Sequence, residues 1–434
     1  MRVLMYGWEF PPHISGGLGV ACFEMTRALR ELGHEITFVV PRLKDGLPPA
    51  SHVQLLGMAQ FATSEQRVVE VETQRFLEGI EIKAIESPLR PYMTDPEYKE
   101  IIEKLQRIHR ERHSSVEEGF HVTFTGDYGS DLIGEVVRYA QVAGAVAATV
   151  PHDVIHAHDW LTMLAGVEAR RVSGKPLVLH VHALEFDRSG ENVNQAVYDI
   201  ERFGMKHADR VVAVSQLTKQ TIVNRYDIDP AKVEVVYNAV SGRPKGANGG
   251  RAARREKVVL FLGRITFQKG PDYFVEAAGK ILQSRDDVRF VMAGSGDMAP
   301  RVIQRVAELR IGKRFHFTGF LTGAAVDRMY EESDIYVMPS VSEPFGISPL
   351  EAMCHDVPVI ISRQSGVAEV LKHSLKIDFW DVGELANKIN ALLDHPSLRD
   401  ELVRQGAHEL ESLKWSNAAR RLTGIYEQLA ARRG

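Results

Sequence analysis

Two carboxylates, Glu343 and Glu351, lie eight positions apart in the stretch SVSEPFGISPLEAM, with Pro344, Gly346 and Pro349 between them. Paired carboxylates can act as general acid and base in sugar cleavage, provided that they flank one bond from opposite sides. Two carboxylates on one short loop and helix are not easily placed on opposite sides of one bond. They are better placed to bind hydroxyl groups from one side. We therefore expect the pair to hold a ligand, with acid/base catalysis as the alternative.

The two carboxylates differ in their local context. Ser348 is expected to cap a helix that has Pro349 at its first position, and Glu351 follows three residues after the serine, which is the pattern of a capping box. Glu343 has no such local role, because it follows the apolar run DIYVMPS in a loop where its carboxylate is expected to face a cleft. Capping and ligand binding are compatible roles for Glu351.

Two cations, Arg264 and Lys269, share the loop of FLGRITFQKGPDYF, and a helix is expected to begin at Pro271. Positive charges are poorly placed beside a helix N-terminus, which favours anions. An added anion would resolve this conflict, so we interpret the loop as a diphosphate site. Two solvated surface cations are the alternative.

Three glycines, Gly16, Gly17 and Gly19, follow the first expected strand in PPHISGGLGVA. They permit close approach of the backbone to a ligand, and the N-H groups of the following helix could bind a phosphate. The spacing fits neither G-x-G-x-x-G nor the P-loop, so a plain tight turn is an equal alternative.

Histidines occur in pairs at the ends of two expected strands, with His156 and His158 in HAHDW and His180 and His182 in LHVHALEFD. We interpret each H-x-H pair as a strand end with one histidine on each side. No Cys or Glu spacing typical of zinc accompanies them, so we expect no metal. His182 can instead donate or accept a hydrogen bond with a substrate.

The size and composition are those of a two-domain protein. The 434 residues suit two domains of about 200 residues each. A net charge of -4 offers nothing to attract nucleic acid, and Cys22 and Cys354 have no metal or redox spacing. The apolar run at the start is shorter than the ~7 residues of a signal peptide core or the ~20 of a membrane helix. We expect a cytoplasmic protein without stable membrane insertion.

Short β-rich runs alternate with helical patterns, which predicts βαβ units around parallel sheets. In the first half the expected strands are RVLMYG, EITFVVP, IEIKAIE, DVIHAH, PLVLHVH, DRVVAVS and VEVVYN. In the first helical segment apolar residues recur with helical spacing, at Ala21, Met25, Ala28, Leu29 and Leu32, and Gly33 is placed to cap its end.

Residues 241–257 break the alternation with Gly, Pro and Arg, as a linker does. We therefore expect two doubly wound, Rossmann-like domains at 1–240 and 258–414, and a C-terminal helix at 415–434 that could return to the first domain. The second domain has expected strands VVLFLGR, DVRFVMAG, RFHFTGF, DIYVMPS and VPVIIS, with helices from about 271, 298, 323 and 349. Residues 87–128 are interpreted as an insertion at the mouth of an interdomain cleft, because ligands bind beyond the carboxyl ends of parallel strands.

Together these motifs resemble one family, the retaining GT-B glycosyltransferases of the glycogen/starch synthase and sucrose synthase type. The resemblance covers nearly the whole chain, in the family's order: GGLGVA, VIHAHDW, HVHALEFDRSGE, VVAVS, VVYNAV, GRITFQKG, MAGSGD, FTGF, PSVSEPFGISPLEAM and SGVAEVL. The combination of G-R-x4-K-G with E-x7-E is specific. The segment MYGWEFPPHISGGLGVA is most similar to bacterial glycogen-synthase-like proteins.

The resemblance implies a nucleotide-sugar donor, ADP-glucose or UDP-glucose, a carbohydrate acceptor, and no further cofactor or metal. It implies that Arg264 and Lys269 bind the donor diphosphate and steady the leaving group, and that the Gly16-Gly17 turn offers a backbone N-H to the same phosphates. A retained anomeric configuration follows from the family, with the departing phosphate taking the acceptor's proton.

For the sugar, the resemblance implies that Glu343 binds the donor hydroxyls and that His182 contacts the sugar near its anomeric carbon. Glu351 would bind the ribose. The backbone amides of Gly346, Ile347 and Ser348 would complete the grip on sugar and phosphate.

The segment KHSLKIDFWDVGELA departs from the Gly-rich G-x-L-V pattern of the family, so contacts from that loop are not carried over. The acceptor side would include Tyr92, His121, Asp127 and Tyr128. These residues follow no pattern that identifies the acceptor. Alternatives are transfer to a glycolipid, disaccharide or cell-surface polysaccharide, a nucleotide-sugar epimerase, a phosphorylase, or a sugar-binding protein without activity. A phosphorylase would need a lysine-held cofactor and a longer chain, and the cationic loop argues against a simple binding protein.

Overall fold

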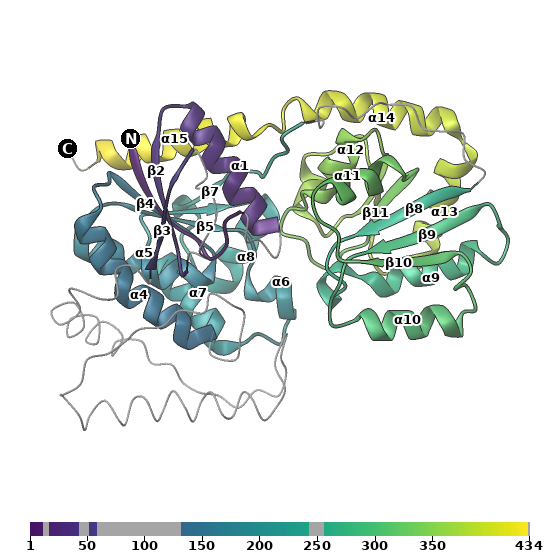
Figure 1. Ribbon diagram of the computed structural model, residues 1–434, viewed down its shortest axis with the longest axis horizontal. Helices are drawn as coiled ribbons and strands as arrows, with labels where there is room; N and C mark the ends of the chain where they lie inside the picture. Colours follow the sequence, from purple (N-terminus) through teal and green to yellow (C-terminus); the bar gives the residue numbers. More distant parts are fainter. Residues whose placement is uncertain (12–16, 43–51, 59–131, 243–255, 433–434) are drawn as a thin grey trace, which may run out of the picture. The chain divides into compact units, whose positions relative to one another are not determined.

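The chain divides into two compact units in the computed structural model, which describes residues 1–11, 17–42, 52–58, 132–242 and 256–432. The first unit comprises Met1–Val214, Thr218–Val236 and Ala418–Gly434, and the second comprises Ser215–Leu217 and Tyr237–Asn417 (Figure 1). The main division falls between Val236 and Tyr237, just before the segment predicted as a linker.

The first unit is built on a seven-stranded parallel sheet in the order β3-β2-β1-β4-β5-β6-β7. Its strands are β1 (Arg2–Tyr6), β2 (Glu35–Val40), β3 (Gln54–Gly57), β4 (Val154–His158), β5 (Leu177–Val181), β6 (Arg210–Ala213) and β7 (Val233–Val235). Strand β3 was not predicted, because it is a short strand at the sheet edge. The expected strand IEIKAIE and the 87–128 insertion lie outside the described residues.

The helices of this unit follow the strands. They are α1 (Gly17–Glu31), α4 (Leu132–Thr149), α5 (Trp160–Ser173), α6 (Glu185–Ser189), α7 (Gln195–His207), α8 (Gln216–Tyr226) and α15 (Trp415–Ala431). Gly33 has a φ of 84° and follows the end of α1, which confirms its predicted place at the helix end. Four of the five predicted stripe residues are buried, but Leu32 lies past the helix and is 41% exposed.

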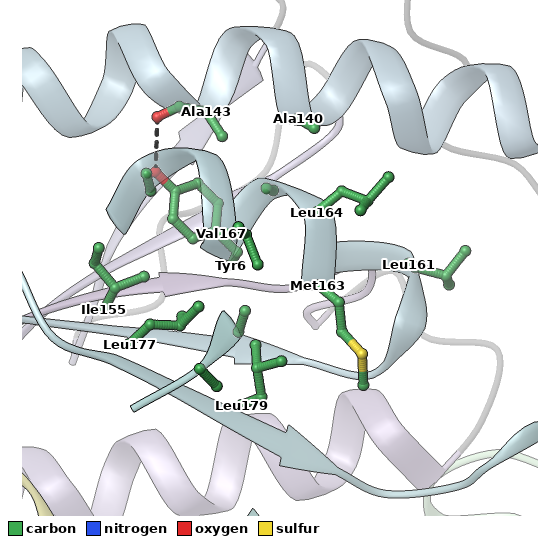
Figure 2. Close-up of a cluster of buried hydrophobic side chains, with 14 of the residues drawn as sticks. Tyr6, Ala140, Ala143, Ile155, Leu161, Met163, Leu164, Val167, Leu177 and Leu179 are labelled. Atoms are coloured by element: carbon green, nitrogen blue, oxygen red, sulfur yellow. Dashed lines mark hydrogen bonds between the residues drawn. The ribbon is translucent and has the colours of Figure 1, made fainter. Parts of the chain in front are cut away.

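One face of the first sheet packs against α4 and α5 (Figure 2). Alternate residues of β4 and β5, including Ile155, Leu177 and Leu179, lie in this core. The hydroxyl of Tyr6 donates to the carbonyl of Ala143 at 3.0 Å, so the buried tyrosine has a partner for its polar end. Because strand side chains alternate between faces, the residues between these apolar positions point to the opposite face.

The second unit contains a six-stranded parallel sheet in the order β10-β9-β8-β11-β12-β13. Its strands are β8 (Lys257–Leu262), β9 (Val288–Ala293), β10 (Phe315–Gly319), β11 (Ile335–Met338), β12 (Val359–Ser362) and β13 (Leu375–Ile377). The short edge strand β13 was not predicted, and it lies in the segment that departs from the family pattern.

The helices of the second unit begin close to the predicted positions. They are α9 (Pro271–Ile281), α10 (Ala299–Glu308), α11 (Ala324–Glu331), α12 (Ser348–Cys354), α13 (Val382–Asp394) and α14 (Pro396–Leu410). A break at residues 411–414 separates α14 from α15, which begins at Trp415. No helix among the described ranges combines the length and apolar character needed to cross a membrane.

Candidate functional site

The strand order of the second sheet reverses between β8 and β11, which lie side by side although β9 and β10 separate them in the chain. Ligands of open parallel sheets bind beyond the carboxyl ends of the strands at such a reversal. The loop after β8 carries Arg264 and Lys269, and the loop after β11 carries Glu343. The backbone N-H of Val341 donates to the carbonyl of Gln268 at 2.9 Å and joins the two loops.

Gly270 allows the close approach of these two loops. It has a φ of 65°, and a Cβ at this position would lie 2.1 Å from the carbonyl oxygen of Pro339. Any side chain would therefore clash with backbone as well as adopt a strained conformation. The glycine ends the short 3-10 turn Phe267–Lys269 and precedes α9, so it fixes Lys269 directly beside the β11 loop.

Lys269 and Glu343 form an ion pair through Nζ and Oε2. Glu343 is 6% exposed, and the hydroxyl of Ser340 lies 3.4 Å from the same carboxylate oxygen. The Glu343 backbone N-H donates to the carbonyl of Gln364, and the Glu343 carbonyl accepts from the N-H of Gly366, so the backbone at Glu343 is held on both sides. Lys269 thus already has a carboxylate partner within the fold, which the sequence did not predict.

Arg264 lies in the same loop and is exposed. Its Nη2 donates to Oε1 of Gln268 at 3.4 Å, and Gln268 itself is buried at 5% exposure. Lys269 is thus half-buried, whereas Arg264 in the same loop is exposed.

The predicted capping box at α12 is wrong. Ile347 stands at the N-cap, so Ser348 and Pro349 are the first two helical residues. The Ser348 hydroxyl accepts from Tyr336 at 2.9 Å, and Oε2 of Glu351 accepts from the Tyr330 hydroxyl at 3.0 Å. These tyrosines come from other elements, which a local pattern cannot reveal.

Glu351 is a half-buried residue of α12. Burial raises its pKa, and the hydrogen bond from Tyr330 opposes this shift in part. The Glu351 carboxylate is thus held by a hydroxyl group from α11.

The other glycines predicted to bind the donor differ in their backbone conformation and in the space around them. Gly346 has a φ of 96°, and a Cβ there would lie 3.1 Å from Met338, so this position also favours glycine. Gly17 is the first residue of α1 and is exposed, with open space around a Cβ. Gly16 lies outside the described residues, as do Tyr92, His121, Asp127 and Tyr128.

The four histidines of β4 and β5 lie on one face of the first sheet, opposite the core formed with α4 and α5. The expectation of one histidine on each side is wrong, because residues two apart in a strand share a face. The rings stack on one another, with centroids 5.3 Å apart for His156 and His180 and 4.2 Å apart for His180 and His182.

His182 follows the carboxyl end of β5 and is partly buried. Its Nε2 lies 3.2 Å from Nδ1 of His158. Burial lowers the pKa of His182, and the nearby Asp159 carboxylate opposes the shift. The ring is therefore neutral at pH 7 and can accept or donate a hydrogen bond.

Asp159 holds the backbone beside His182. Its Oδ1 accepts from the backbone N-H groups of His182, at 2.6 Å, and of Ala183, at 3.2 Å. Asp159 stands directly before α5 but does not cap it, and its φ of 58° and ψ of 176° lie where glycine is favoured. Asp159 was not predicted as a functional residue, and its only signal in the sequence is its place in the HDW motif.

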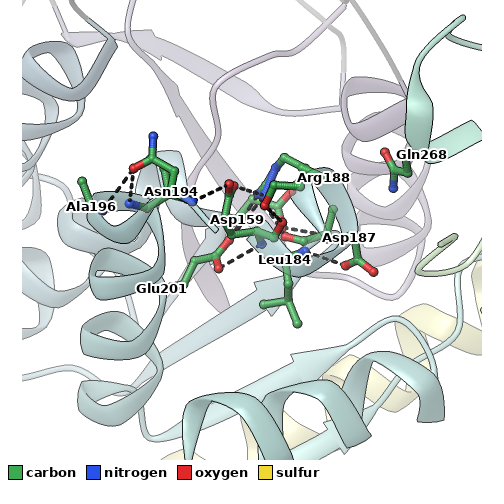
Figure 3. Close-up of polar contacts among 12 residues, drawn as sticks. Asp159, Leu184, Asp187, Arg188, Asn194, Ala196, Glu201 and Gln268 are labelled. Carbon is green, nitrogen blue, oxygen red and sulfur yellow. Dashed lines mark hydrogen bonds and ion pairs between the residues drawn. The ribbon is translucent and has the colours of Figure 1, made fainter. Parts of the chain in front are cut away.

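A buried polar cluster supports the chain after Ala183 (Figure 3). Arg188 donates from Nη2 to Glu201 and to the carbonyl of Ala183, both at 3.2 Å. Glu201 also accepts from the Tyr226 hydroxyl, and burial raises the pKa of Glu201 to about 8, against the opposing effect of Arg188. These contacts fix the turn that carries His182.

Two family profiles match the chain. Residues 247–409 match "Glycosyl transferases group 1", and residues 106–241 match "Glycosyltransferase Family 4".

Curated relatives match over most of the chain. A glycogen synthase of Mycobacterium tuberculosis is 25% identical, and the match covers 100% of this chain and 96% of that protein. An uncharacterized glycosyltransferase of Methanocaldococcus jannaschii is 26% identical, with 98% of both chains covered. A D-inositol 3-phosphate glycosyltransferase of Acidothermus cellulolyticus is 30% identical over 65% of this chain and 68% of that protein.

Solved structures share the fold. Sucrose-phosphate synthase of Thermosynechococcus elongatus superposes with a TM-score of 0.72 at 17% identity, over 99% of both chains. Anabaena HepE, solved in complex with UDP and glucose, superposes with a TM-score of 0.67 at 16% identity, over 99% of this chain and 100% of that one. The two parallel-sheet units thus form a GT-B fold, as the sequence predicted.

Proposed function

The chain belongs to the group 1 glycosyltransferases, and from this membership we propose that it is a retaining hexosyltransferase. Its donor is a nucleotide-glucose, UDP-glucose or ADP-glucose, and its acceptor is a hydroxyl group of an α-glucan or another carbohydrate. The relatedness to glycogen synthase over the whole chain supports the glucan. The structural similarity to HepE, which was solved with UDP and glucose bound, supports the donor class.

The observation that carries this proposal is the Lys269–Glu343 pair at the strand reversal of the second sheet, with Arg264 in the same loop. Breaking the bond between a sugar and a nucleoside diphosphate develops negative charge on the leaving oxygen. Fixed cations stabilise that charge, and each contact that strengthens in the transition state contributes about 2 to 4 kcal/mol. The lysine ammonium has three N-H donors, so Glu343 and phosphate oxygens can bind it together.

Glu343 then has two tasks in the proposal. Its carboxylate positions Lys269, and its second oxygen accepts from hydroxyl groups of the donor sugar. The backbone amides of Gly346, Ile347 and Ser348 add donors for the sugar and phosphates, and Glu351 binds the ribose. Because Arg264 and Lys269 neutralise the leaving group, the transfer needs no Mg²⁺.

His182 contacts the transferring sugar near its anomeric carbon in this proposal, and Gly17 offers its N-H to the phosphates. The neutral imidazole suits a hydrogen bond to a sugar hydroxyl. The chain offers no enzyme nucleophile among these residues, so the acceptor hydroxyl attacks from the leaving-group side and the departing phosphate takes its proton.

A different acceptor is the second candidate. The relatives named as D-inositol 3-phosphate glycosyltransferases, at 30% identity, favour a small phosphorylated polyol over a polymer. This candidate shares the donor chemistry and differs only in the acceptor.

The proposal is tested by measuring the nucleotide released from UDP-glucose and ADP-glucose with and without acceptor. With an α-glucan, released nucleotide should equal the label that enters the polymer, and the new linkage should be sensitive to an α-glucosidase. Inositol 3-phosphate is the parallel acceptor. Nucleotide release that no acceptor stimulates would contradict the proposal, and so would a β-linked product. An epimerase would convert the donor sugar without releasing any nucleotide.

A further inference from the structure

One face of the first sheet gathers side chains whose donor atoms suit a transition metal. They form two groups, Cys22 with His158 and His182, and His156 with His158 and His180. Within each group one ligand atom from every residue lies within 4.8 Å of the others. The chain shows no zinc-like spacing because Cys22 comes from α1 and the histidines come from two separate strands.

The imidazole nitrogens of the second group lack partners. Nε2 of His156, Nε2 of His158 and both ring nitrogens of His180 are buried and make no hydrogen bond among the described residues. The three histidines are between 0% and 2% exposed. A buried polar atom without a partner costs about 1 to 3 kcal/mol, so four such atoms in one place need a physical reason.

The other nitrogens of two of these rings are held. Nδ1 of His156 lies 2.6 Å from the hydroxyl of Tyr426, and Nδ1 of His158 lies 3.2 Å from Nε2 of His182. A histidine that binds a metal through one nitrogen is characteristically held through the other by a neighbouring group. His156 and His158 therefore have their Nε2 lone pairs oriented and available.

We propose that His156, His158 and His180 bind one divalent transition-metal ion of the Zn²⁺ type. Imidazole is a preferred ligand of Zn²⁺, Co²⁺ and Cu²⁺, whereas Mg²⁺ and Ca²⁺ prefer oxygen. The rings of His156 and His180 stack with their planes 4° apart, so one of them turns out of the stack as the ion binds.

The three proposed ligands are not among the residues assigned to the donor, although His158 contacts His182. The test of this metal site is therefore independent of transferase activity. The purified full-length chain is stripped with a chelator, desalted and titrated with Co²⁺, whose visible absorption reports a site of four or five ligands. The matched variants are His180→Gln within the group and His316→Gln at an exposed histidine of β10.

The expected result is one bound Co²⁺ per chain, displaced by Zn²⁺, in the wild type and in the His316→Gln variant. Loss of an outer partner of a metal ligand alone weakens binding by ~10 to 100-fold, so His180→Gln should weaken it at least that much. Melting curves of the stripped proteins check that the variant folds. No Co²⁺ absorption in the wild type, or equal affinity in the His180→Gln variant, overturns the proposal.

A Cys22→Ser variant separates the two groups. A thiolate ligand adds an intense near-ultraviolet charge-transfer band to the Co²⁺ spectrum. If that band appears, disappears in Cys22→Ser and persists in His180→Gln, the ion lies at Cys22, His158 and His182, and the proposed ligand set is wrong.

Discussion

Asp159 Oδ1 accepts the backbone N-H of His182 at 2.6 Å, and this contact ties the end of β4 to the end of β5. Asp159 adopts a glycine-like backbone conformation in order to make it, with a φ of 58°. Such a conformation costs about 1 to 3 kcal/mol and persists only where surrounding contacts compensate. The position of His182 therefore depends on a strained neighbour.

Two substitutions of Asp159 should distinguish the effect of its backbone strain on stability from the effect of its carboxylate on activity. Asp159→Ala removes the acceptor and should lower transfer about a hundredfold, because small displacements of a positioned group cost that much. Asp159→Gly should be equally inactive but more stable than Asp159→Ala by about 1 kcal/mol, since glycine tolerates the conformation. Steady-state rates and urea unfolding measure the two effects. Asp286→Ala, at an exposed position, is the control, and full activity in Asp159→Ala would refute the positioning role.

Substitutions of the two cations in the loop after β8 should have similar effects on turnover but different effects on stability. Arg264→Ala and Lys269→Ala should each lower turnover by about 10² to 10³-fold, the loss expected for one contact to a developing charge. Only Lys269→Ala should also destabilise the protein, because it leaves Glu343 buried without its cation. Lys313→Ala, at an exposed position, should change neither quantity. Unchanged turnover in Arg264→Ala and Lys269→Ala would remove the diphosphate assignment.

Glu343→Gln should impair use of the sugar more than binding of the nucleotide. Glutamine can still donate or accept a hydrogen bond near Lys269, but it loses the charge that orders the sugar hydroxyls. We expect the KM for the nucleotide-glucose to rise at least about tenfold, while the Kd for the free nucleoside diphosphate changes less than about threefold. Calorimetry and kinetics provide the two constants. Equal losses in both would assign Glu343 to the phosphates instead.

The four clustered histidines of the first unit predict that the folded protein loses stability in acid. Burial lowers the pKa of His156 to about 3 and lowers those of His158, His180 and His182 in the same direction. The unfolded rings titrate near ~6.5, so below that pH the unfolded chain binds more protons than the folded one. The stabilisation is complete about one unit above pH 6.5, and well below pH 6.5 it falls by about 1.4 kcal/mol per pH unit for each such histidine.

His180→Leu tests this dependence. Between about pH 6.5 and about pH 5.5, the variant should lose about 1 kcal/mol less stability than the wild type, because the unfolded ring is already half protonated at the upper end of this range. Urea midpoints measured in the presence of a chelator give the difference, and His316→Leu should behave as the wild type does. A His180→Leu variant with the full acid sensitivity would show that the histidine face does not set it.

Most strands and the loops that follow them were predictable from the sequence. Apolar runs of strand length, separated by helical patterns, suffice to place β8 and β11, and parallel connections bring their carboxyl ends to one edge of the second sheet. The cations and Glu343 could thus be placed near one another from sequence. The short edge strands β3 and β13 carry too few apolar residues to produce a pattern.

The side-chain partners could not be predicted in the same way. The capping box failed because Tyr330 and Tyr336, from α11 and β11, take the polar atoms that the local pattern assigned to the helix end. The pairing of Lys269 with Glu343 depends on the close approach at Gly270, which only the fold reveals. Asp159 was missed because its backbone conformation is imposed by its distant hydrogen bonds.

The last helix has a consequence for biosynthesis. Residues from Ala418 onward belong to the first unit, where Thr423 lies 2.8 Å from Nε2 of His34 and Tyr426 holds His156 (Figure 1). A ribosome releases the chain from its N-terminus, so the second unit is translated in full while the first still lacks its final helix. Until α15 has been translated, His156 lacks the Tyr426 hydroxyl that holds it, and a nascent chain stalled before Trp415 would expose this histidine to chaperones and metal ions.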